Sequence, residues 1–205
     1  VAEQNSVVGT ANTAEFDDVA RLEDERYNLL NWSAVHQGSG KRWYGDLFEQ
    51  TRSREYSLTF PNVLNQPSSV RMEFAGRCDG VGSAVRLTAD AGVFSASIGG
   101  TDNDNNNALV ANHVTINGTF TPDNDVVGLK VEYLNTPKVS QGWLDFIEIN
   151  VRRKLIMTNK MMSFRDLSSR LNTTTTFNLS GASSGLNIWD ITNYSTPARQ
   201  VYALT

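Results

Sequence analysis

The sequence contains one cysteine, two histidines and no long apolar segment, and each shortage excludes a class of protein. Cys78 has no second thiol to pair with, so no internal disulfide forms. This suits a cytosolic chain and also an exported one that is large enough to fold without cross-links. No run approaches the roughly 18 apolar residues that a transmembrane helix needs, so no integral membrane segment is expected. His36 and His113 have no metal-binding spacing, and the sequence predicts neither a metal site nor a cofactor.

An excess of basic residues is also missing. Lysine and arginine total 18 against 22 aspartates and glutamates, and the formal net charge at pH 7 is -4. A nucleic-acid partner is not expected, because neutralising phosphates requires a basic face. The charge is uneven, since residues 15–26 hold six acids and two bases, whereas residues 150–205 hold seven bases and two acids. Regions of opposite sign attract each other or a partner, although charge runs are more often simply solvated surfaces.

Enough apolar material is present for a folded core. Of the 205 residues, 40% are hydrophobic, and the aromatic residues comprise 9 Phe, 6 Tyr and 4 Trp. This composition describes one globular domain, or one with a small appendage, and excludes a disordered chain. The sequence begins at Val1 and stops at Thr205 within an alternating pattern, so we expect the natural chain to continue beyond it.

Alternation of apolar and polar residues with a period of two is the dominant pattern, and it predicts an all-β domain. It is clearest in residues 70–78, where Val70, Met72 and Phe74 share one face with Cys78. Similar patterns mark strands at residues 56–60, 85–89, 94–98, 110–116, 127–133 and 143–156, with turn-forming Pro, Asn, Asp and Gly residues between them. In the last of these strands the apolar residues change face near Asp145. This predicts either a strand covered on both faces or, as we favour, a β-bulge.

Strands of this length without a convincing helix between them favour a β-sandwich or barrel over alternating βαβ units. We predict a jelly-roll β-sandwich domain at residues 41–157. An acidic, partly ordered leader, residues 1–40, precedes it. A β-rich extension, residues 158–205, follows and packs on the sandwich or starts the next domain. Within the leader, the apolar residues of 16–30 fit a helical stripe only loosely, because Glu23 interrupts it.

The residues that carry chemistry do not assemble into a catalytic site. Cys78 has the core-facing parity of its strand, which indicates a buried structural thiol and not a nucleophile. His113 has the opposite parity to Val114 and Ile116, so we expect it on an exposed or partly covered surface. Residues 102–106, DNDNN, offer side-chain oxygens as calcium loops do, but the loop glycine and the glutamate at the twelfth position are missing. We therefore expect a polar hairpin tip there.

Several aromatic residues are candidates for a sugar-stacking platform, because a pyranose ring offers a CH-rich face to an aromatic ring. They are Trp32, Trp43, Tyr44, Trp143 and Trp189. Each lies beside apolar residues, so a place in the core or at its rim is the ordinary alternative.

Four segments together resemble one protein family. Residues 38–48, GSGKRWYGDLF, and residues 143–155, WLDFIEINVRRKL, are similar to an N-terminal segment and a long strand of gingipain-like (C25 peptidase) signal peptidases, or sortases, of type IX secretion. Residues 164–166, FRD, are similar to the short strand that follows in that family. Residues 188–197 resemble its WDVTDPxxP segment. The order of the four segments is the family's, and the LDxIEx strand also occurs in galactose-binding-like jelly rolls, in agreement with the alternation.

The resemblance implies an accessory region outside the cytoplasm, associated with the outer membrane, the cell surface or the periplasm. In the family, a caspase-like domain with a Cys/His dyad follows this region. That domain removes the C-terminal sorting signal of secreted cargo and joins the cargo to lipopolysaccharide. Neither His36 nor His113 has the family's histidine-glycine setting, and Cys78 belongs to a strand, so no catalytic residue carries over and this chain is not expected to be an enzyme. The implied partners are the protein's own C-terminal catalytic domain, secretion-system proteins and cargo.

Two sets of residues are the candidate contacts. Arg152, Arg153 and Lys154 continue the long strand where its apolar pattern fades, so they are candidates for a contact with an acidic partner surface. Alternatively, their stems cover an apolar edge and serve the structure. Trp43 and Trp143 are the candidate ligand contacts for the alternative function, a carbohydrate-binding module that stacks glycans on Trp side chains.

Overall fold

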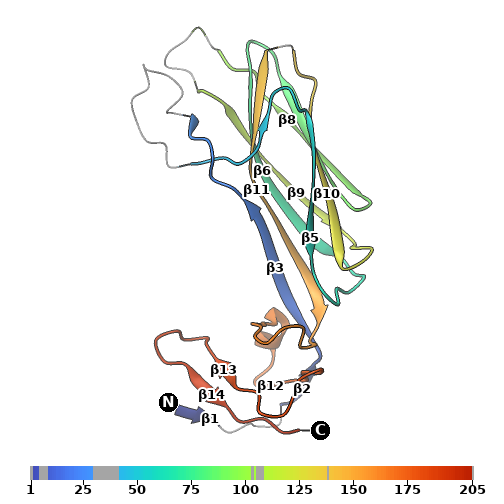
Figure 1. Ribbon diagram of the computed structural model, residues 1–205, viewed down its shortest axis with the longest axis vertical. Helices are drawn as coiled ribbons and strands as arrows, with labels where there is room; N and C mark the ends of the chain where they lie inside the picture. Colours follow the sequence, from blue (N-terminus) through green and yellow to red (C-terminus); the bar gives the residue numbers. More distant parts are fainter. Residues whose placement is uncertain are drawn as a thin grey trace. The chain divides into compact units, whose positions relative to one another are not determined.

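The computed structural model describes residues 2–4, 9–29, 42–102, 104, 109–137 and 139–204 (Figure 1). They are almost entirely β-strand and turn, which confirms the all-β prediction. Within these ranges no helix is both long and apolar enough to cross a membrane. The chain divides into two compact units, which we call the sandwich unit, Asp18–Arg152, and the terminal unit, Val1–Asp17 with Arg153–Thr205.

The sandwich unit is built from two antiparallel sheets. One has the strand order β5-β10-β7-β8, and the other has the order β3-β11-β6-β9 with β4 also paired to β11. The bounds are β3 Glu15–Glu23, β4 Leu47–Phe48, β5 Ser53–Thr59, β6 Ser68–Cys78, β7 Ser83–Ala89, β8 Gly92–Ile98, β9 Asn112–Phe120, β10 Val126–Leu134 and β11 Ser140–Lys154. This is the predicted jelly-roll type of β-sandwich, and β7 and β8 form the predicted hairpin over residues 85–98.

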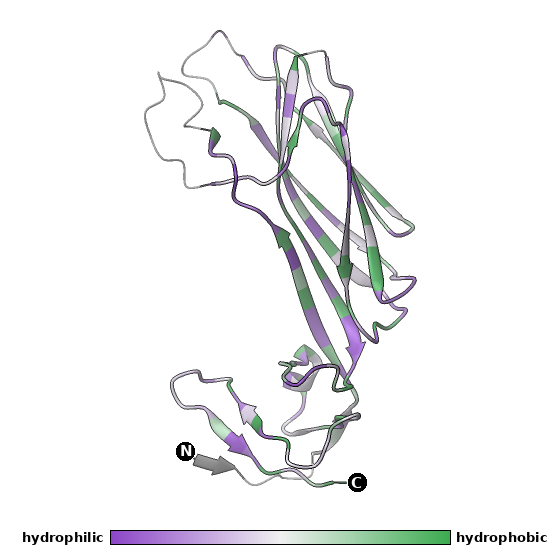
Figure 2. Cartoon of the chain, in the orientation of Figure 1, coloured by the Kyte–Doolittle hydropathy of each residue, from purple (hydrophilic) through white to green (hydrophobic). Residues whose placement is uncertain are grey.

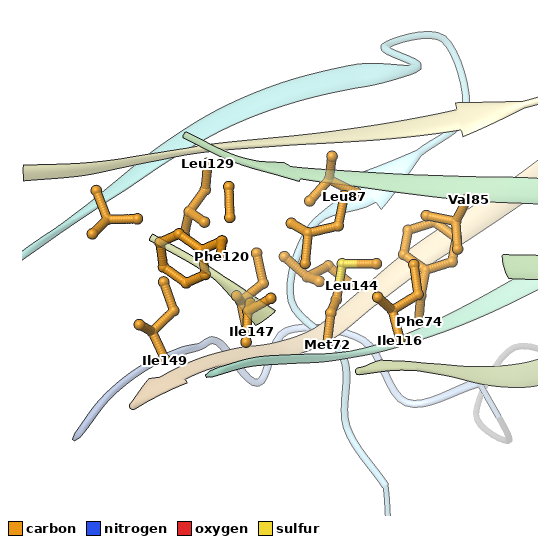
Figure 3. Packing of buried hydrophobic residues seen from close by; sticks show 14 of the residues in the cluster. Met72, Phe74, Val85, Leu87, Ile116, Phe120, Leu129, Leu144, Ile147 and Ile149 are labelled. Carbon is orange, nitrogen blue, oxygen red and sulfur yellow. The ribbon is translucent and has the colours of Figure 1, made fainter. Parts of the chain in front are cut away.

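The core lies between the two sheets and follows from the alternation. Met72 and Phe74 of β6 and Ile147 of β11 face Leu87 of β7 and Leu129 of β10 across the interior (Figure 3), and these side chains are almost inaccessible to solvent. Figure 2 shows the matching alternation of hydrophobic and hydrophilic residues along the strands. Burying every second side chain on each sheet supplies the main stabilising term of this unit.

The structure contains the predicted β-bulge. The pairing of β11 with β6 shifts register between Leu144 and Phe146, so Asp145 is the extra residue. Residues 142–147 are also buried on both faces of the strand. Both explanations of the parity change are therefore correct.

The described part of the loose helical stripe, residues 16–29, forms no α-helix, and this corrects the sequence interpretation. Residues 15–23 form strand β3, in which Ala20 and Leu22 pack toward the core while Val19 and Arg21 are exposed. A period of two fits these residues better than a period of 3.6, because Glu23 falls on the outer face of a strand but in the middle of a helical stripe.

The terminal unit joins the two ends of the sequence in small sheets. β1 (Ala2–Gln4) pairs parallel to β14 (Ala198–Gln200), which pairs antiparallel to β13 (Ile188–Asp190); β2 (Ala11–Thr13) pairs parallel to β12 (Thr175–Phe177). The 3-10 helix η2 (Leu167–Leu171) follows its capping residue Asp166. Each small sheet thus combines one strand from the predicted leader with one or two strands from the predicted extension.

Candidate partner-contact surfaces

The three basic residues at the end of β11 do not present one common surface. Lys154 is exposed, whereas Arg153 is only 8% exposed and its guanidinium carbon lies 5.0 Å from the centre of the Phe16 ring. The carbonyl of Arg152 accepts a hydrogen bond from the amide of Leu64, at 2.9 Å. Arg153 therefore covers an apolar ring in the terminal unit, as the structural alternative proposed, and Lys154 is the exposed cation of this stretch.

The two candidate tryptophans have different surroundings. Trp43 is 40% exposed, whereas Trp143 is 6% exposed and belongs to a small second core with Tyr44, Ala75 and Ala111. Trp143 and Tyr44 therefore do not extend a stacking surface around Trp43. Trp189, in the terminal unit, is 44% exposed, and Trp32 lies outside the described residues.

A cluster of charged and aromatic side chains that no sequence motif marks lies on the outer face of the β3-β11-β6-β9 sheet. Arg42 forms ion pairs with Glu73, at 3.2 Å, and with Asp145, at 3.5 Å. The two carboxylates are nearly buried, whereas the Arg42 side chain is about half exposed. Burial is the leading cause that raises the pKa of Asp145 above its ordinary value, and the nearby Arg42 opposes it. The β-bulge places Asp145 beside Arg42, which is why sequence spacing alone did not reveal the cluster.

His113 joins this cluster from β9. Arg42 Nη1 donates a hydrogen bond to His113 Nδ1, at 3.0 Å. Because Nδ1 is the acceptor, the neutral imidazole carries its hydrogen on Nε2. Nε2 donates this hydrogen to the Tyr44 hydroxyl, at 2.9 Å. Partial burial and then the Arg42 charge lower the pKa of His113, and burial raises the pKa of Tyr44 to about 12. Both groups are therefore neutral at pH 7, and the arrangement fixes residues 42–44 against the sheet.

Phe146 is an apolar residue on the outer face that is covered by arginines. The guanidinium carbon of Arg21 lies 3.6 Å from the ring centre and that of Arg71 lies 5.4 Å away, so Phe146 is only 6% exposed. Glu23 and Glu148 pair with Arg21 in turn. The arginine side-chain stems and their ion pairs thus shield the Phe146 ring from solvent on the outer face of the sheet.

The described residues do not bring the cysteine to a base. Cys78 is fully buried between the two sheets, where its sulfur lies 3.9 Å from the Tyr133 hydroxyl. His113 projects from the opposite, outer face of the same sheet. A thiol and an imidazole on opposite faces cannot form a nucleophile-base pair. The described residues also contain no group of three or more His, Cys, Asp or Glu side chains able to hold a metal ion; Asn103, Asn105 and Asn106 of the calcium-like loop, and His36, lie outside them.

The terminal unit exposes many large apolar side chains for its size. Among its described residues only Phe16 and Leu155 are buried hydrophobic residues. Eight large hydrophobic residues are exposed: Met161, Leu167, Leu171, Trp189, Ile191, Tyr194, Val201 and Leu204. An open hollow of about 590 Å³ is lined by residues 157–160, Gly181, Ser183 and Leu186. Exposed apolar groups at this density are typical of a surface that another molecule covers.

The fold is similar to part of a solved protein. No family model and no curated protein matches the sequence. The crystal structure of dimeric latent PorU from Porphyromonas gingivalis matches with a TM-score of 0.77 and 18% identity, covering 98% of this chain and 19% of the PorU chain. The chain thus spans about a fifth of the length of PorU. At this identity the likeness shows a shared fold, and the match extends over both units.

Other solved structures match only weakly. The insecticidal delta-endotoxin Cry8Ea1 from Bacillus thuringiensis has a TM-score of 0.39 at 17% identity, over 57% of this chain and 23% of the toxin. The CBM36-1 domain of a xylanase from the hindgut metagenome of Trinervitermes trinervoides has a TM-score of 0.36 at 10% identity, over 65% of this chain and 95% of that domain. Scores this low carry no argument about function.

Proposed function

We propose that this chain is a non-catalytic β-sandwich region of a gingipain-like type IX secretion signal peptidase. It acts outside the cytoplasm, at the outer membrane or cell surface, where it scaffolds the catalytic domain or docks cargo and secretion partners. The observation that carries the proposal is the fold match to PorU over 98% of the chain. It agrees with the independent resemblance of four sequence segments, in the same order, to that family.

The resembling segments have structural roles here. Residues 143–154 are the greater part of β11, including the bulge. Residues 44–48 lie beside this strand: Leu47 pairs with Trp143, and the Gly45 amide donates to the Leu144 carbonyl at 2.8 Å. Residues 188–190 are strand β13. Segments that pack against one another preserve a fold, so their resemblance favours a scaffold and not a reaction centre.

The proposal is tested on the longer natural protein that contains this chain. We expect that protein to remove the C-terminal sorting signal from a secreted cargo protein, and to lose this activity when the cysteine of its catalytic domain is replaced. Replacing Cys78 by alanine in the same protein is the matched control and leaves cleavage unchanged, because this thiol is buried between the two sheets, on the face opposite to His113. A longer protein without peptidase activity, or a folded Cys78→Ala variant that has lost it, contradicts the proposal.

A carbohydrate-binding module is the second candidate, and the exposed ring of Trp43 is the observation that favours it. Titration of this chain with a panel of glycans, with and without EDTA, tests it. Saturable binding that Trp43→Ala abolishes supports a module, and binding that survives this substitution contradicts a role for Trp43.

A further inference from the structure

Residues 160–171 of the terminal unit, KMMSFRDLSSRL, carry exposed cations and exposed apolar side chains in alternation, and we call them the basic segment. Its exposed large apolar residues are Met161, Leu167 and Leu171. Its exposed cations are Lys160, Arg165 and Arg170. The three apolar side chains are 61–88% exposed, so they project from the surface and do not line a groove.

The basic segment is held in place by its inward side chains and its backbone. Phe164 packs on Phe177 of β12, with ring centres 5.4 Å apart. The Asp17 amide donates to the Arg165 carbonyl at 2.7 Å, and the Asp17 carboxylate accepts from the Leu167 amide, also at 2.7 Å. Because these contacts fix the backbone, the outward side chains of the segment are exposed by the fold itself.

The cations of the basic segment are not neutralised by neighbouring acids. The carboxylate of Asp17 is engaged with a backbone amide, and that of Asp166 is nearly buried and accepts from the amide and the hydroxyl of Ser168. None of the three cations forms an ion pair within the part of the chain that the structure describes. The exposed charge of the segment is therefore positive, and it complements a surface with many negative charges.

The side-chain types of the basic segment favour a lipid surface over a protein. Protein interfaces obtain most of their binding energy from Trp, Tyr and Arg in closely packed pockets, and leucine is under-represented among these residues. Here the projecting residues are leucine and methionine, with arginine and lysine between them. This combination is typical of segments that lie at a membrane surface, where apolar side chains enter the headgroup boundary and cations bind anionic headgroups.

We propose that the basic segment binds the surface of a bilayer that contains anionic lipids. Arg165 and Arg170 contact the headgroup phosphates, while Leu167 and Leu171 enter the apolar boundary beneath them. A soluble phosphate is not the ligand, because the leucines gain apolar burial only from a bilayer. The contact is a property of this chain whether or not a peptidase domain follows, so it goes beyond the function proposed above.

Co-sedimentation of this chain with lipid vesicles tests the proposal. We expect binding to vesicles of phosphatidylcholine and phosphatidylglycerol in equal parts, and much weaker binding to phosphatidylcholine alone. Raising the salt from about 0.1 M to about 1 M shortens the screening length from about 10 Å to about 3 Å and should release most of the protein. Equal binding to both kinds of vesicle overturns the proposal. Binding to neither kind also overturns it and leaves an acidic protein as the partner.

Two double variants with the same change in formal charge locate the contact. Arg165→Gln with Arg170→Gln should weaken binding to the anionic vesicles about 25-fold, since each cation is worth a factor of about five at such a surface. Arg86→Gln with Lys130→Gln, at side chains of the sandwich unit that are 43% and 42% exposed, should change binding by less than about twofold. An equal loss in both double variants shows that net charge alone is responsible and overturns the assignment to the basic segment.

A fluorophore in place of the Leu171 side chain tests whether the leucines enter the lipid. Leu171→Cys is labelled with the polarity-sensitive dye NBD, and wild type is the labelling blank because Cys78 is buried. On anionic vesicles we expect a blue shift and an emission increase of about twofold or more. The same label on Val126→Cys, at a 46% exposed residue of the sandwich unit, should not respond. Vesicle binding without a response from the Leu171→Cys label overturns the proposed insertion.

The longer natural protein that contains this chain completes the test. It should bind the same anionic vesicles and lose this binding with Arg165→Gln and Arg170→Gln. A longer protein that does not bind overturns the proposal, because the rest of the protein then covers the basic segment. None of these results bears on the proposed function, which is tested by cleavage of a sorting signal. A longer protein without peptidase activity, conversely, leaves the vesicle predictions unchanged.

Discussion

The sandwich unit and the terminal unit have similar strand chemistry but very different interiors. The sandwich unit contains nearly all of the buried hydrophobic residues, whereas Phe16 and Leu155 are those of the terminal unit's described residues. The core of the sandwich unit is enclosed between its own two sheets. The second unit is ordered by strand pairing between the ends of the sequence and leaves its large apolar residues on the surface. The same alternation thus builds a core in the sandwich unit and leaves apolar side chains exposed in the terminal unit, which is where a partner is expected.

The largest effect is expected from Phe74→Ala. Phe74 is fully buried and contacts Phe48 and Tyr133 at ring-centre distances of 5.3 and 5.5 Å. Removing the ring leaves a cavity and should lower the free energy of unfolding by about 3–5 kcal/mol. Urea denaturation followed by tryptophan fluorescence measures this change.

Leu171→Ala is the matched comparison in the terminal unit. Leu171 is 88% exposed, so its truncation should change the free energy of unfolding by less than about 0.5 kcal/mol. A loss comparable to that of Phe74→Ala would show that Leu171 is buried in the isolated chain, and the contrast between the two units would fail.

The second largest effect is expected from Phe16→Ala. Phe16 is 1% exposed and lies under the Arg153 guanidinium, so it is the main apolar anchor of the terminal unit. We expect a loss of about 3 kcal/mol that is confined to the terminal unit, since a unit with a thin core unfolds separately. Hydrogen exchange should show faster exchange in β12 to β14 and unchanged protection in β6, β7 and β10. Uniformly faster exchange in all of these strands would mean that the two units unfold together.

The sequence was sufficient for most strands of the sandwich unit, because their apolar and polar residues alternate over long stretches, but it missed β3, which was assigned to the leader. The core-facing position of Cys78 and the bulge at Asp145 were predicted from the same alternation of apolar and polar residues. The sequence was insufficient where the structure depends on pairing between segments that are far apart along the chain. Nothing near Trp189 indicates that β1, at the other end of the sequence, pairs with β14 and completes the sheet. Likewise Arg42, Glu73 and His113 come from three separate segments, and only the sheet register brings them together.

A smaller effect is expected from Arg21→Ala. The Arg21 guanidinium stacks on Phe146 at 3.6 Å, but its side chain is 39% exposed and its ion pairs are therefore screened by solvent. We expect a loss of about 0.5–1 kcal/mol in the free energy of unfolding, mainly from uncovering the ring. Arg21→Met is the control, because it keeps an apolar stem over Phe146 and should recover part of the loss. If Arg21→Met is as unstable as Arg21→Ala, the ion pairs and not the stem are responsible.

The smallest and most specific effect is the pH dependence of the His113 contact. Partial burial and Arg42 lower the pKa of His113 in the folded protein below its ordinary 6.5, while Glu73 opposes this shift. The stabilising contribution is therefore complete above pH 6.5 and is lost as the pH falls through the folded pKa, because protonation places a second cation beside Arg42. Asp145 acts in the opposite sense, since its raised pKa relieves a buried charge as the pH falls.

The difference between wild type and His113→Gln, which keeps an acceptor for Arg42 but does not titrate, isolates the histidine. The free energy of unfolding of wild type should fall relative to that of His113→Gln as the pH falls below 6.5, and curves that stay parallel would show that the Arg42 contact does not depend on a neutral imidazole.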